Sequence, residues 1–439
     1  MLMCLSNIEI YASRSGGDRN LHERKFLYFA YGSNLLDRRM RINSPSAVFI
    51  TPAKLPHYRL DFDKYLANWR GAVATIAEHF RSDVWGAIWA IDISEIAALD
   101  GKNDNPASVW DETDKWISNQ SLFPHENGVG GKILHALQSS QIALVDNALK
   151  GTQLKLLLLI EGKQKVYFKP KRYNLDHVIK GNIYAGFDRH NSEVFAYYLA
   201  MVLNFKWIAP SVIRHIHLDK DIVPVATSGL RRTMVKNDNG ALCIYGKCFY
   251  CKVNETVCPD SKGQVEGAAI LFLDKTFKVY KSPWRRSYSS KKMEWETDND
   301  FCTKVRGTLS TKRLLNLIDV AIFDFLIQNG DRHRYEVYKE QIILLDNGKG
   351  LGNPLVDELD ILAPLYQCCI MASSTWQHLE IISGGSLTET VKILSAFQGH
   401  KLATEEHFRA VERRLLKIYA TVQYCIGRYG SSKVFKNGF

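Results

Sequence analysis

The 439-residue sequence contains no apolar run of the roughly 18 residues that a membrane-spanning helix requires. Its longest apolar stretch, residues 154–161, has the length of a strand and is interrupted by Lys155. The first 20 residues lack the basic start and the continuous apolar segment of a secretory signal peptide. Internal repeats and low-complexity tracts are absent as well. We therefore expect a globular protein without a membrane span, and we read no signal peptide in this chain.

Acidic residues are fewer than basic ones, 46 against 57, so the net charge is +11. A basic surface favours anionic partners such as nucleotides, nucleic acids or sulfated and phosphorylated glycans. Surplus lysine that serves only solubility explains the charge equally well. The basic run at residues 281–295 could steer an anionic glycan or ATP, or it could be a solvated loop.

Nine cysteines are present: Cys4 stands alone and the other eight lie between residues 243 and 425. An even set confined to one part of the chain indicates four disulfides in an oxidising compartment. A zinc cluster is the alternative for the first four of them, but their gaps of 4, 2 and 6 residues do not match the C-x₂-C pairs of a zinc ribbon. Free thiols in the core are a third explanation. Candidate N-glycosylation sites at Asn119 and Asn254 fit a secretory setting.

The predicted secondary structure changes near residue 105, from strands to a mixture of helices and strands. Residues 26–100 contain strand-length apolar or alternating runs, and the turn formers of residues 101–106 indicate a boundary. From about residue 108 onward, longer helical patterns are mixed with strands. We expect an N-terminal tail (1–25), a mixed β segment (26–104), a second domain (108–430) and a C-terminal tail (431–439).

Four charged residues of the second domain occur in an order that suits phosphoryl transfer. Lys169 ends an alternating strand, Glu193 begins an apolar-periodic helix, Asp331 follows an apolar helix, and Asp346 ends an apolar strand before Asn-Gly. Each alone has an ordinary explanation as an exposed lysine, a first-turn acid or a turn aspartate. Together they offer a cation for phosphates, carboxylates for a metal and an acid near the attacking hydroxyl. The spacing therefore predicts a phosphotransferase.

The first part of the chain resembles the γ-glutamylcyclotransferase family. The resemblance rests on "YFAYGSNLL" (28–36), "GAVATI" (71–76) and "VWGAIW" (84–89). It implies an anion-binding turn made by Tyr31, Gly32, Ser33 and Asn34. The family's glutamate acid/base would fall at Asn103, whose amide cannot transfer a proton. We therefore expect a truncated, inactive half-domain or a gene-fusion artefact, with a live cyclotransferase as the alternative.

From about residue 108 to residue 430, the chain resembles the secretory-pathway kinase family that includes the Golgi casein kinase. The resemblance is carried by long motifs: "KVYFKPKRYNLDHVI" (165–179), "YAGFDRHNSEV" (184–194), "GDRHRYE" (330–336), "ILLDNGK" (343–349) and "ILAPLYQCCI" (361–370). It implies that Lys169 grips the nucleotide phosphates, that Asp331 is the catalytic base, and that Asp346 and Glu193 bind Mn²⁺ or Mg²⁺. Glu336 would reinforce the metal or hold the loop.

The same resemblance implies an α+β fold, namely an atypical two-lobed kinase-like fold with disulfides. The family's bridge pattern carries over to Cys243–Cys258, Cys248–Cys251, Cys302–Cys368 and Cys369–Cys425. It also implies a Golgi-lumenal or secreted protein, although no leader is visible here.

Within this family, "YGKCFYC" (245–251) and "STW" (374–376) are most similar to the xylosylkinase branch. That implies ATP-dependent phosphorylation of the 2-hydroxyl of xylose in the proteoglycan linkage region. The alternatives are a secretory Ser/Thr protein kinase and a non-catalytic pseudokinase scaffold, because both acceptors need only a hydroxyl near Asp331. We expect a glycan partner, no nucleic acid, and possible oligomers with family members. Trp284, Trp295 and Trp376 could stack on sugar rings or simply pack in the core.

Overall fold

The computed structural model describes residues 9–10, 25–66, 71–92, 95, 109–110, 113, 129–148, 151–289, 291–396 and 399–437. Asn103, Asn119 and Cys4 lie outside the described residues. The backbone packs into two compact units, the first mainly residues 1–112 and the second mainly residues 133–395 and 400–439. Among the helices of the described part, none has the length and hydrophobicity that crossing a bilayer needs.

The first unit contains an antiparallel sheet in the order β1-β3-β4-β2. Its strands are β1 (Glu9–Ile10), β2 (Lys25–Ala30), β3 (Val48–Leu66) and β4 (Gly71–Asp92). The short helices η1 (Ser33–Leu35) and α1 (Asp37–Asn43) follow β2. Ile88 and Ile91 on β4 are fully buried and belong to two different apolar clusters, because residues three apart on a strand point to opposite faces of the sheet.

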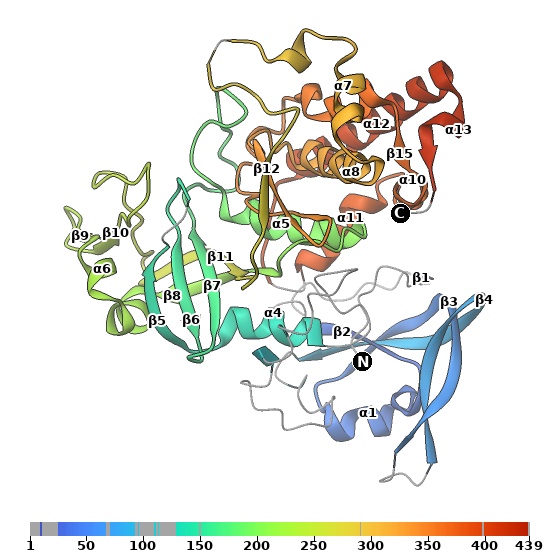
Figure 1. Cartoon of the computed structure of the whole chain (residues 1–439). Coiled ribbons are helices and arrows are strands. Elements are labelled where there is room, and N and C mark those ends of the chain that lie inside the picture. Colours follow the sequence, from blue (N-terminus) through green and yellow to red (C-terminus); the bar gives the residue numbers. More distant parts are fainter. Residues whose placement is uncertain are drawn as a thin grey trace. The chain divides into compact units, whose positions relative to one another are not determined.

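The strand-rich lobe of the second unit is a five-stranded antiparallel sheet, β5-β6-β7-β11-β8 (Figure 1). Its strands are β5 (Ile142–Asn147), β6 (Leu156–Ile160), β7 (Gln164–Pro170), β8 (Ser211–His217) and β11 (Gln264–Leu271). Helix α5 (His190–Val202) packs on β8 and β11 and buries all but one of its 13 residues. A helix covered on every side is rigid, so α5 can hold a functional side chain in place.

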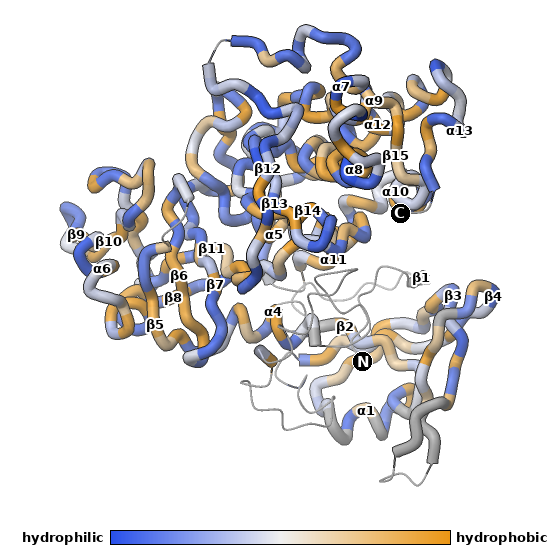
Figure 2. The backbone as a smooth tube through the Cα atoms, viewed as in Figure 1, coloured by the Kyte–Doolittle hydropathy of each residue, from blue (hydrophilic) through white to orange (hydrophobic). Residues whose placement is uncertain are grey.

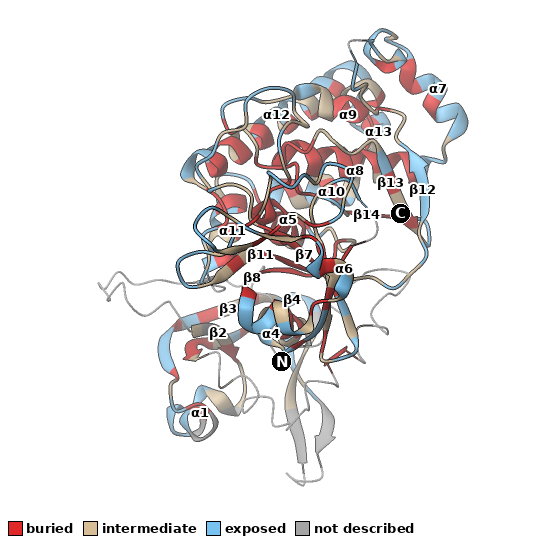
Figure 3. Cartoon of the chain, turned by 90° about the vertical axis from the view of Figure 1, so that its left-hand side faces the viewer, coloured by how far each residue is buried: buried red, intermediate tan, exposed pale blue. Residues whose placement is uncertain are grey.

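The helix-rich lobe is built around α8 (Thr311–Ile327), which is buried over most of its length (Figure 3). Apolar residues run along this helix (Figure 2), and it packs against η7 (Leu359–Leu362), α9 (Ala363–Cys368) and α12 (Glu405–Tyr429). The hydroxyl of Ser310 caps its start by accepting from the Arg313 backbone N–H. The helix ends at Gln328, which adopts the left-handed conformation with φ 58°. The chain then enters the loop that carries Asp331.

The remaining elements border these two lobes. The sheet β12-β13-β14 consists of β12 (Lys278–Lys281), β13 (Arg334–Tyr338) and β14 (Gln341–Ile343). The other helices are α4 (Val129–Ser139), η4 (Leu218–Ile222), η5 (Val223–Val225), α6 (Ser228–Arg231), η6 (Glu294–Glu296), α7 (Phe301–Thr308), α10 (Ser373–Ile381), α11 (Ser386–Ala396) and α13 (Ser431–Val434). The other strands are β9 (Met234–Lys236), β10 (Leu242–Ile244), β15 (Met371–Ala372) and β16 (Phe435–Lys436). This second unit has the expected α+β architecture, with a strand-rich lobe and a helix-rich lobe.

Four cysteine pairs lie at disulfide distance, and they are the four pairs that the family resemblance implies. The S–S distances are 2.11 Å for Cys243–Cys258, 2.00 Å for Cys248–Cys251, 1.90 Å for Cys302–Cys368 and 1.98 Å for Cys369–Cys425. The last bridge joins the end of α9 to α12 and is buried together with Val434. It therefore ties α12 to the core of the helix-rich lobe.

Removing the Cys369–Cys425 bridge is expected to destabilise the protein strongly. The bridge closes a loop of 56 residues, and the chain-entropy model assigns about 4 kcal/mol to a loop of that length. A Cys369→Ala/Cys425→Ala variant should show this loss in guanidinium denaturation. The matched control is Cys248→Ala/Cys251→Ala, which opens a bridge between residues only three apart and should cost clearly less. Equal losses for the two variants would contradict the loop-closure explanation.

Candidate active site

Lys169 is the centre of a buried ion cluster in the second unit. It lies on β7 opposite Ala268 of β11, and the residue is only 6% exposed. Its ammonium donates to three carboxylates: Asp188 Oδ2 at 2.9 Å, Glu193 Oε1 at 2.6 Å and Asp346 Oδ1 at 2.5 Å. These acids come from the segment before α5, from α5 itself and from the end of the β13–β14 hairpin. The cluster therefore joins the sheet, the helix and the hairpin at one point.

The acids and bases of this cluster shift the pKa values of one another. Burial alone would lower the pKa of Lys169, but the surrounding carboxylates outweigh burial and raise that pKa well above its ordinary value. The nearby Lys169 ammonium holds the pKa of Asp346 far below its usual range. Lys349 is a second cation at the edge, 3.7 Å from Asp188. Three carboxylates therefore share the close Lys169 ammonium, while Lys349 and Lys155 add positive charge around them.

The Asn-Gly turn after β14 places Asp346 next to Asp188 and Glu193. Asp346 adopts a left-handed φ of 57°, and the backbone N–H of Asn347 donates to Glu193 Oε2 at 3.1 Å. A Cβ on Gly348 would lie 2.7 Å from the Cβ of Asp188. Glycine is therefore required for this close approach, because a side chain there would clash with Asp188.

Asp331 occupies the loop between α8 and β13. Its Oδ1 accepts from the Tyr288 hydroxyl at 2.8 Å and lies 2.9 Å from His333 Nε2. The side chain of the neighbouring Arg332 is only 8% exposed and donates to both carboxylate oxygens of Asp324, at 2.6 and 2.9 Å. Arg332 also donates to the Leu345 carbonyl at 2.5 Å. This arginine fastens the Asp331 loop to the residue before Asp346, so the two candidate catalytic acids keep a fixed separation.

The candidate residues line one cleft of about 1230 Å³. Lys169, Asp331, Asp346 and Glu336 all contribute to its wall. Glu193 lies behind this wall, where it accepts from the cleft residue Lys169 and from the Asn347 backbone N–H. Glu336 lies on β13, and burial raises the pKa of its carboxyl. The structure thus brings together the five charged residues that the sequence singled out.

The sequence patterns did not indicate three further side chains that lie at this site. Asp188 is the third partner of Lys169. Lys155 also lines the cleft, and burial together with the Lys169 charge lowers its pKa. Tyr288 contacts Asp331 and lies with its ring 4.3 Å from that of His333. The only sequence signal for Asp188 was its position just before α5, and Tyr288 offered none beyond the basic run that contains it.

The remaining candidates lie elsewhere. Trp284 and Trp295 are buried and donate to Gln367 Oε1 and the Arg285 carbonyl, so core packing accounts for both. Trp376 packs against Tyr419 and Phe435. The Asn254 sequon is exposed on the loop that the Cys243–Cys258 bridge closes.

Hydrogen bonds of the backbone and of a side chain close the turn that follows β2 in the first unit. The Leu35 backbone N–H donates to the Gly32 carbonyl at 3.0 Å, and the Asn34 amide donates to the Tyr28 hydroxyl at 3.1 Å. Tyr31 is partly buried, which raises the pKa of its hydroxyl. An anion-binding role for Tyr31, Gly32, Ser33 and Asn34 stays a prediction.

A buried lysine held by a helix glutamate and a strand-end aspartate, with a loop aspartate on the wall of the same cleft, defines a kinase-type phosphotransferase. The chain belongs to the Fam20 kinase family, because the family model described as "Golgi casein kinase, C-terminal, Fam20" matches residues 108–434. It is 43% identical over 339 residues to a glycosaminoglycan xylosylkinase homolog from Drosophila melanogaster, covering 76% of this chain and 80% of the relative. It is 42% identical to the human glycosaminoglycan xylosylkinase, covering 74% and 82%.

Solved structures agree with this assignment. The hydra Fam20 structure with sugar has a TM-score of 0.71 and 39% identity and covers 75% of this chain and 98% of that one. The Golgi casein kinase with Mn/ADP bound has a TM-score of 0.71 and 28% identity and covers 77% and 85%. A γ-glutamyl cyclotransferase covers 33% of this chain with a TM-score of only 0.17. The similarity of the first unit to that family therefore stays a prediction.

Proposed function

We propose that this chain is an ATP-dependent kinase that phosphorylates the 2-hydroxyl of xylose in the glycosaminoglycan–protein linkage region. The observation that supports this most directly is the convergence of Lys169, Asp331 and Asp346 on one cleft. Relatives above 40% identity are named glycosaminoglycan xylosylkinases and align over most of their length, which favours a sugar acceptor. The kinase domain would comprise residues 108–430, and residues 26–104 would form the cyclotransferase-like segment.

The residues of the cleft fit a nucleotide with a divalent cation. Asp346 and Glu193, whose carboxylates meet at Lys169, would hold Mn²⁺ or Mg²⁺, because carboxylate oxygens are ligands that such an ion prefers. In the described part of the chain, no group of three or more His, Cys, Asp or Glu residues is arranged as a metal site. Phosphate oxygens of the nucleotide would complete the coordination, as they commonly do in kinases. When bound, the ion neutralises charge on the phosphates.

The protein's own residues then position the two reactants. Lys169 binds phosphate oxygens, and Asp331 accepts the hydrogen bond of the sugar hydroxyl in the place that the Tyr288 hydroxyl occupies. The sugar oxygen forms a bond to the γ-phosphorus, the bond from that phosphorus to the ADP oxygen breaks, and the hydroxyl proton passes to Asp331. The hydrogen bond from Arg332 to the Leu345 carbonyl holds the Asp331 loop close to Asp346.

A Ser/Thr protein kinase is the second candidate, because the Golgi casein kinase structure shares the fold at 28% identity. A pseudokinase scaffold is less well supported, since Lys169, Glu193, Asp331 and Asp346 are all present. Four disulfides favour a Golgi or extracellular location, where such bonds persist. Association with other family members is a further proposal.

The acceptor that receives the phosphate distinguishes between these functions. The full chain, with ATP and Mn²⁺, is offered a β-galactosyl-xyloside or an acidic serine peptide, and added phosphate is measured by mass. We expect one phosphate on the glycan and none on the peptide. The matched control acceptor is the corresponding 2-deoxyxyloside, which should stay unmodified because it lacks the attacking oxygen. Phosphate on the peptide alone would indicate the protein kinase, and transfer to neither acceptor would favour the scaffold.

A further inference from the structure

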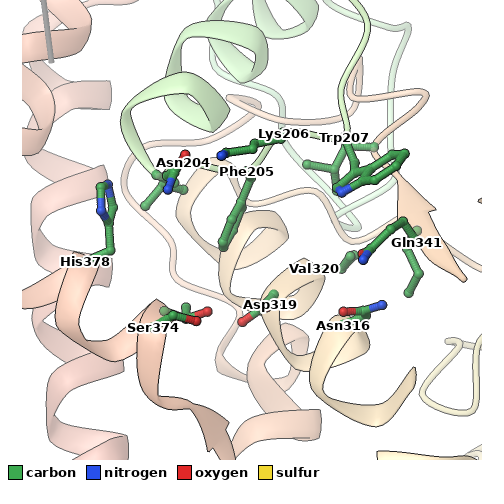
Figure 4. Close-up of a pocket in the computed structure, with 14 residues that line it drawn as sticks. Asn204, Phe205, Lys206, Trp207, Asn316, Asp319, Val320, Gln341, Ser374 and His378 are labelled. Carbon is green, nitrogen blue, oxygen red and sulfur yellow. The ribbon is translucent and has the colours of Figure 1, made fainter. Parts of the chain in front are cut away.

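The hydroxyl of Tyr288 occupies the carboxylate of the proposed base in this structure. It donates to Asp331 Oδ1 at 2.8 Å, and both residues line the catalytic cleft. A smaller pocket between α8 and the start of α10, which Asp319 lines, shares no lining residue with this cleft (Figure 4). A hydroxyl that competes with Tyr288 for Asp331 therefore has to enter through the catalytic cleft.

Two ring contacts hold Tyr288 beside the base. Its ring lies 4.9 Å from that of Tyr184, edge to face, and 4.3 Å from that of His333. Aromatic rings at such distances attract one another weakly. Tyr288 is 66% exposed and the side chain of Asp331 is 27% exposed, so both can be reached from solvent.

The segment that carries Tyr288 is fastened at its two ends. Arg286 pairs with Asp360 before it, and after it the Met293 backbone N–H donates to a carboxylate of η6 at 2.6 Å. Among the described residues of 287–292, the hydroxyl of Tyr288 makes the only hydrogen bond that leaves the segment, and the others are internal. Releasing the base therefore costs one hydrogen bond and the ring contacts, while the anchors at both ends stay in place.

The phenol O–H is the same kind of donor as the hydroxyl of an acceptor. Two hydroxyls cannot occupy one position on the Asp331 carboxylate, so one has to leave before the other binds there. We propose that Tyr288 is a built-in competitor of the acceptor: its hydroxyl covers Asp331 until an acceptor hydroxyl displaces it. This inference rests on the proposed function, because it takes Asp331 as the base that binds the acceptor.

The variant Tyr288→Phe keeps the ring and removes the competing hydroxyl. A competitor that covers the base for about 70–90% of the time weakens apparent affinity about three- to tenfold, so the KM for the acceptor should fall by that factor. The kcat should not fall, because a saturating acceptor displaces the tyrosine in the wild type as well. Initial rates of the full chain with ATP and Mn²⁺ measure both constants, on whichever of the xyloside and the serine peptide takes up phosphate.

The contact itself is tested without turnover. Burial, and after it the hydrogen bond to Asp331 and the charge of that carboxylate, raise the pKa of the Tyr288 hydroxyl above its ordinary value. Asp331→Asn should lower this pKa, because a carboxylate then no longer opposes the phenolate. NMR of the full chain with ring-labelled tyrosine measures the pKa, on the signal that Tyr288→Phe lacks. An unchanged pKa would place the hydroxyl away from Asp331 in solution and overturn the proposal, whichever acceptor is used.

The matched control is Tyr280→Phe, which removes the hydroxyl of an exposed tyrosine on β12 that does not line the cleft. It should leave KM and kcat near the wild-type values. An unchanged acceptor KM in Tyr288→Phe would mean that the acceptor uses the other carboxylate oxygen, and would overturn the competition. A lower kcat would make Tyr288 a positioning residue for Asp331 and would overturn it too.

The same rates separate this inference from the proposed function. Transfer to the peptide alone, with a lowered KM in Tyr288→Phe, would overturn the sugar acceptor and support the competition. Transfer to the xyloside with an unchanged KM would support the sugar acceptor and overturn the competition. Transfer to neither acceptor by any variant would overturn both.

Discussion

Replacing Asp331 with asparagine is expected to lower kcat about 10²–10⁴-fold, the usual contribution of a positioned general base. The amide keeps the shape of the side chain but cannot accept the proton of the sugar hydroxyl. Asp331 makes no ion pair with Lys169, so the phosphate-binding cluster is untouched. Steady-state phosphate transfer to the xyloside measures the loss, and calorimetry should show unchanged affinity for Mn²⁺–ADP.

The matched control for this prediction is Asp238→Asn, which alters an exposed aspartate in the turn between β9 and β10. It should leave transfer near the wild-type rate. Full activity in Asp331→Asn would contradict the assignment of the base. A parallel loss of nucleotide affinity would mean that Asp331 supports the cleft rather than the proton transfer.

Replacing Lys169 with methionine is expected to affect both activity and folding. Loss of a preorganised cation that contacts phosphate oxygens should lower kcat/KM at least about a hundredfold. The change also leaves Asp188, Glu193 and Asp346 without their shared ammonium. Breaking a buried ion pair by removing one partner typically costs about 3–5 kcal/mol. Thermal unfolding of the free chain and nucleotide calorimetry measure the two effects.

The same variant tests whether the acid cluster suits a divalent cation. Because three carboxylates are then unpaired, added Mn²⁺ should raise the unfolding temperature of Lys169→Met more than that of the wild type. Lys165→Met, an exposed lysine on the same strand, is the control and should behave like the wild type. An unchanged unfolding temperature and nucleotide affinity in Lys169→Met would refute the role of the cluster.

Local sequence patterns predicted the elements that carry the site. The strand that carries Lys169 and the strand before Asp346 have the apolar patterns and turn residues that their structure requires. The helix that carries Glu193 was expected from its apolar pattern, but its burial on almost every side was not. The role of Arg332 could not be predicted in the same way. Its partners Asp324 and Leu345 lie 8 and 13 residues away, on a helix and in the hairpin, and only packing brings them to one guanidinium.

By itself the sequence determined which chemical groups are available: one strand lysine, helix and loop acids in kinase order, and eight cysteines confined to one region. Only the tertiary structure decided that Asp188 is the third acid on Lys169, that the Tyr288 hydroxyl lies on Asp331, and that Asp319 is left with an unpaired oxygen. The physical reason is distance along the chain. Lys169 and Asp346 are 177 residues apart, so their contact depends on the packing of a sheet, a helix and a hairpin rather than on any local pattern.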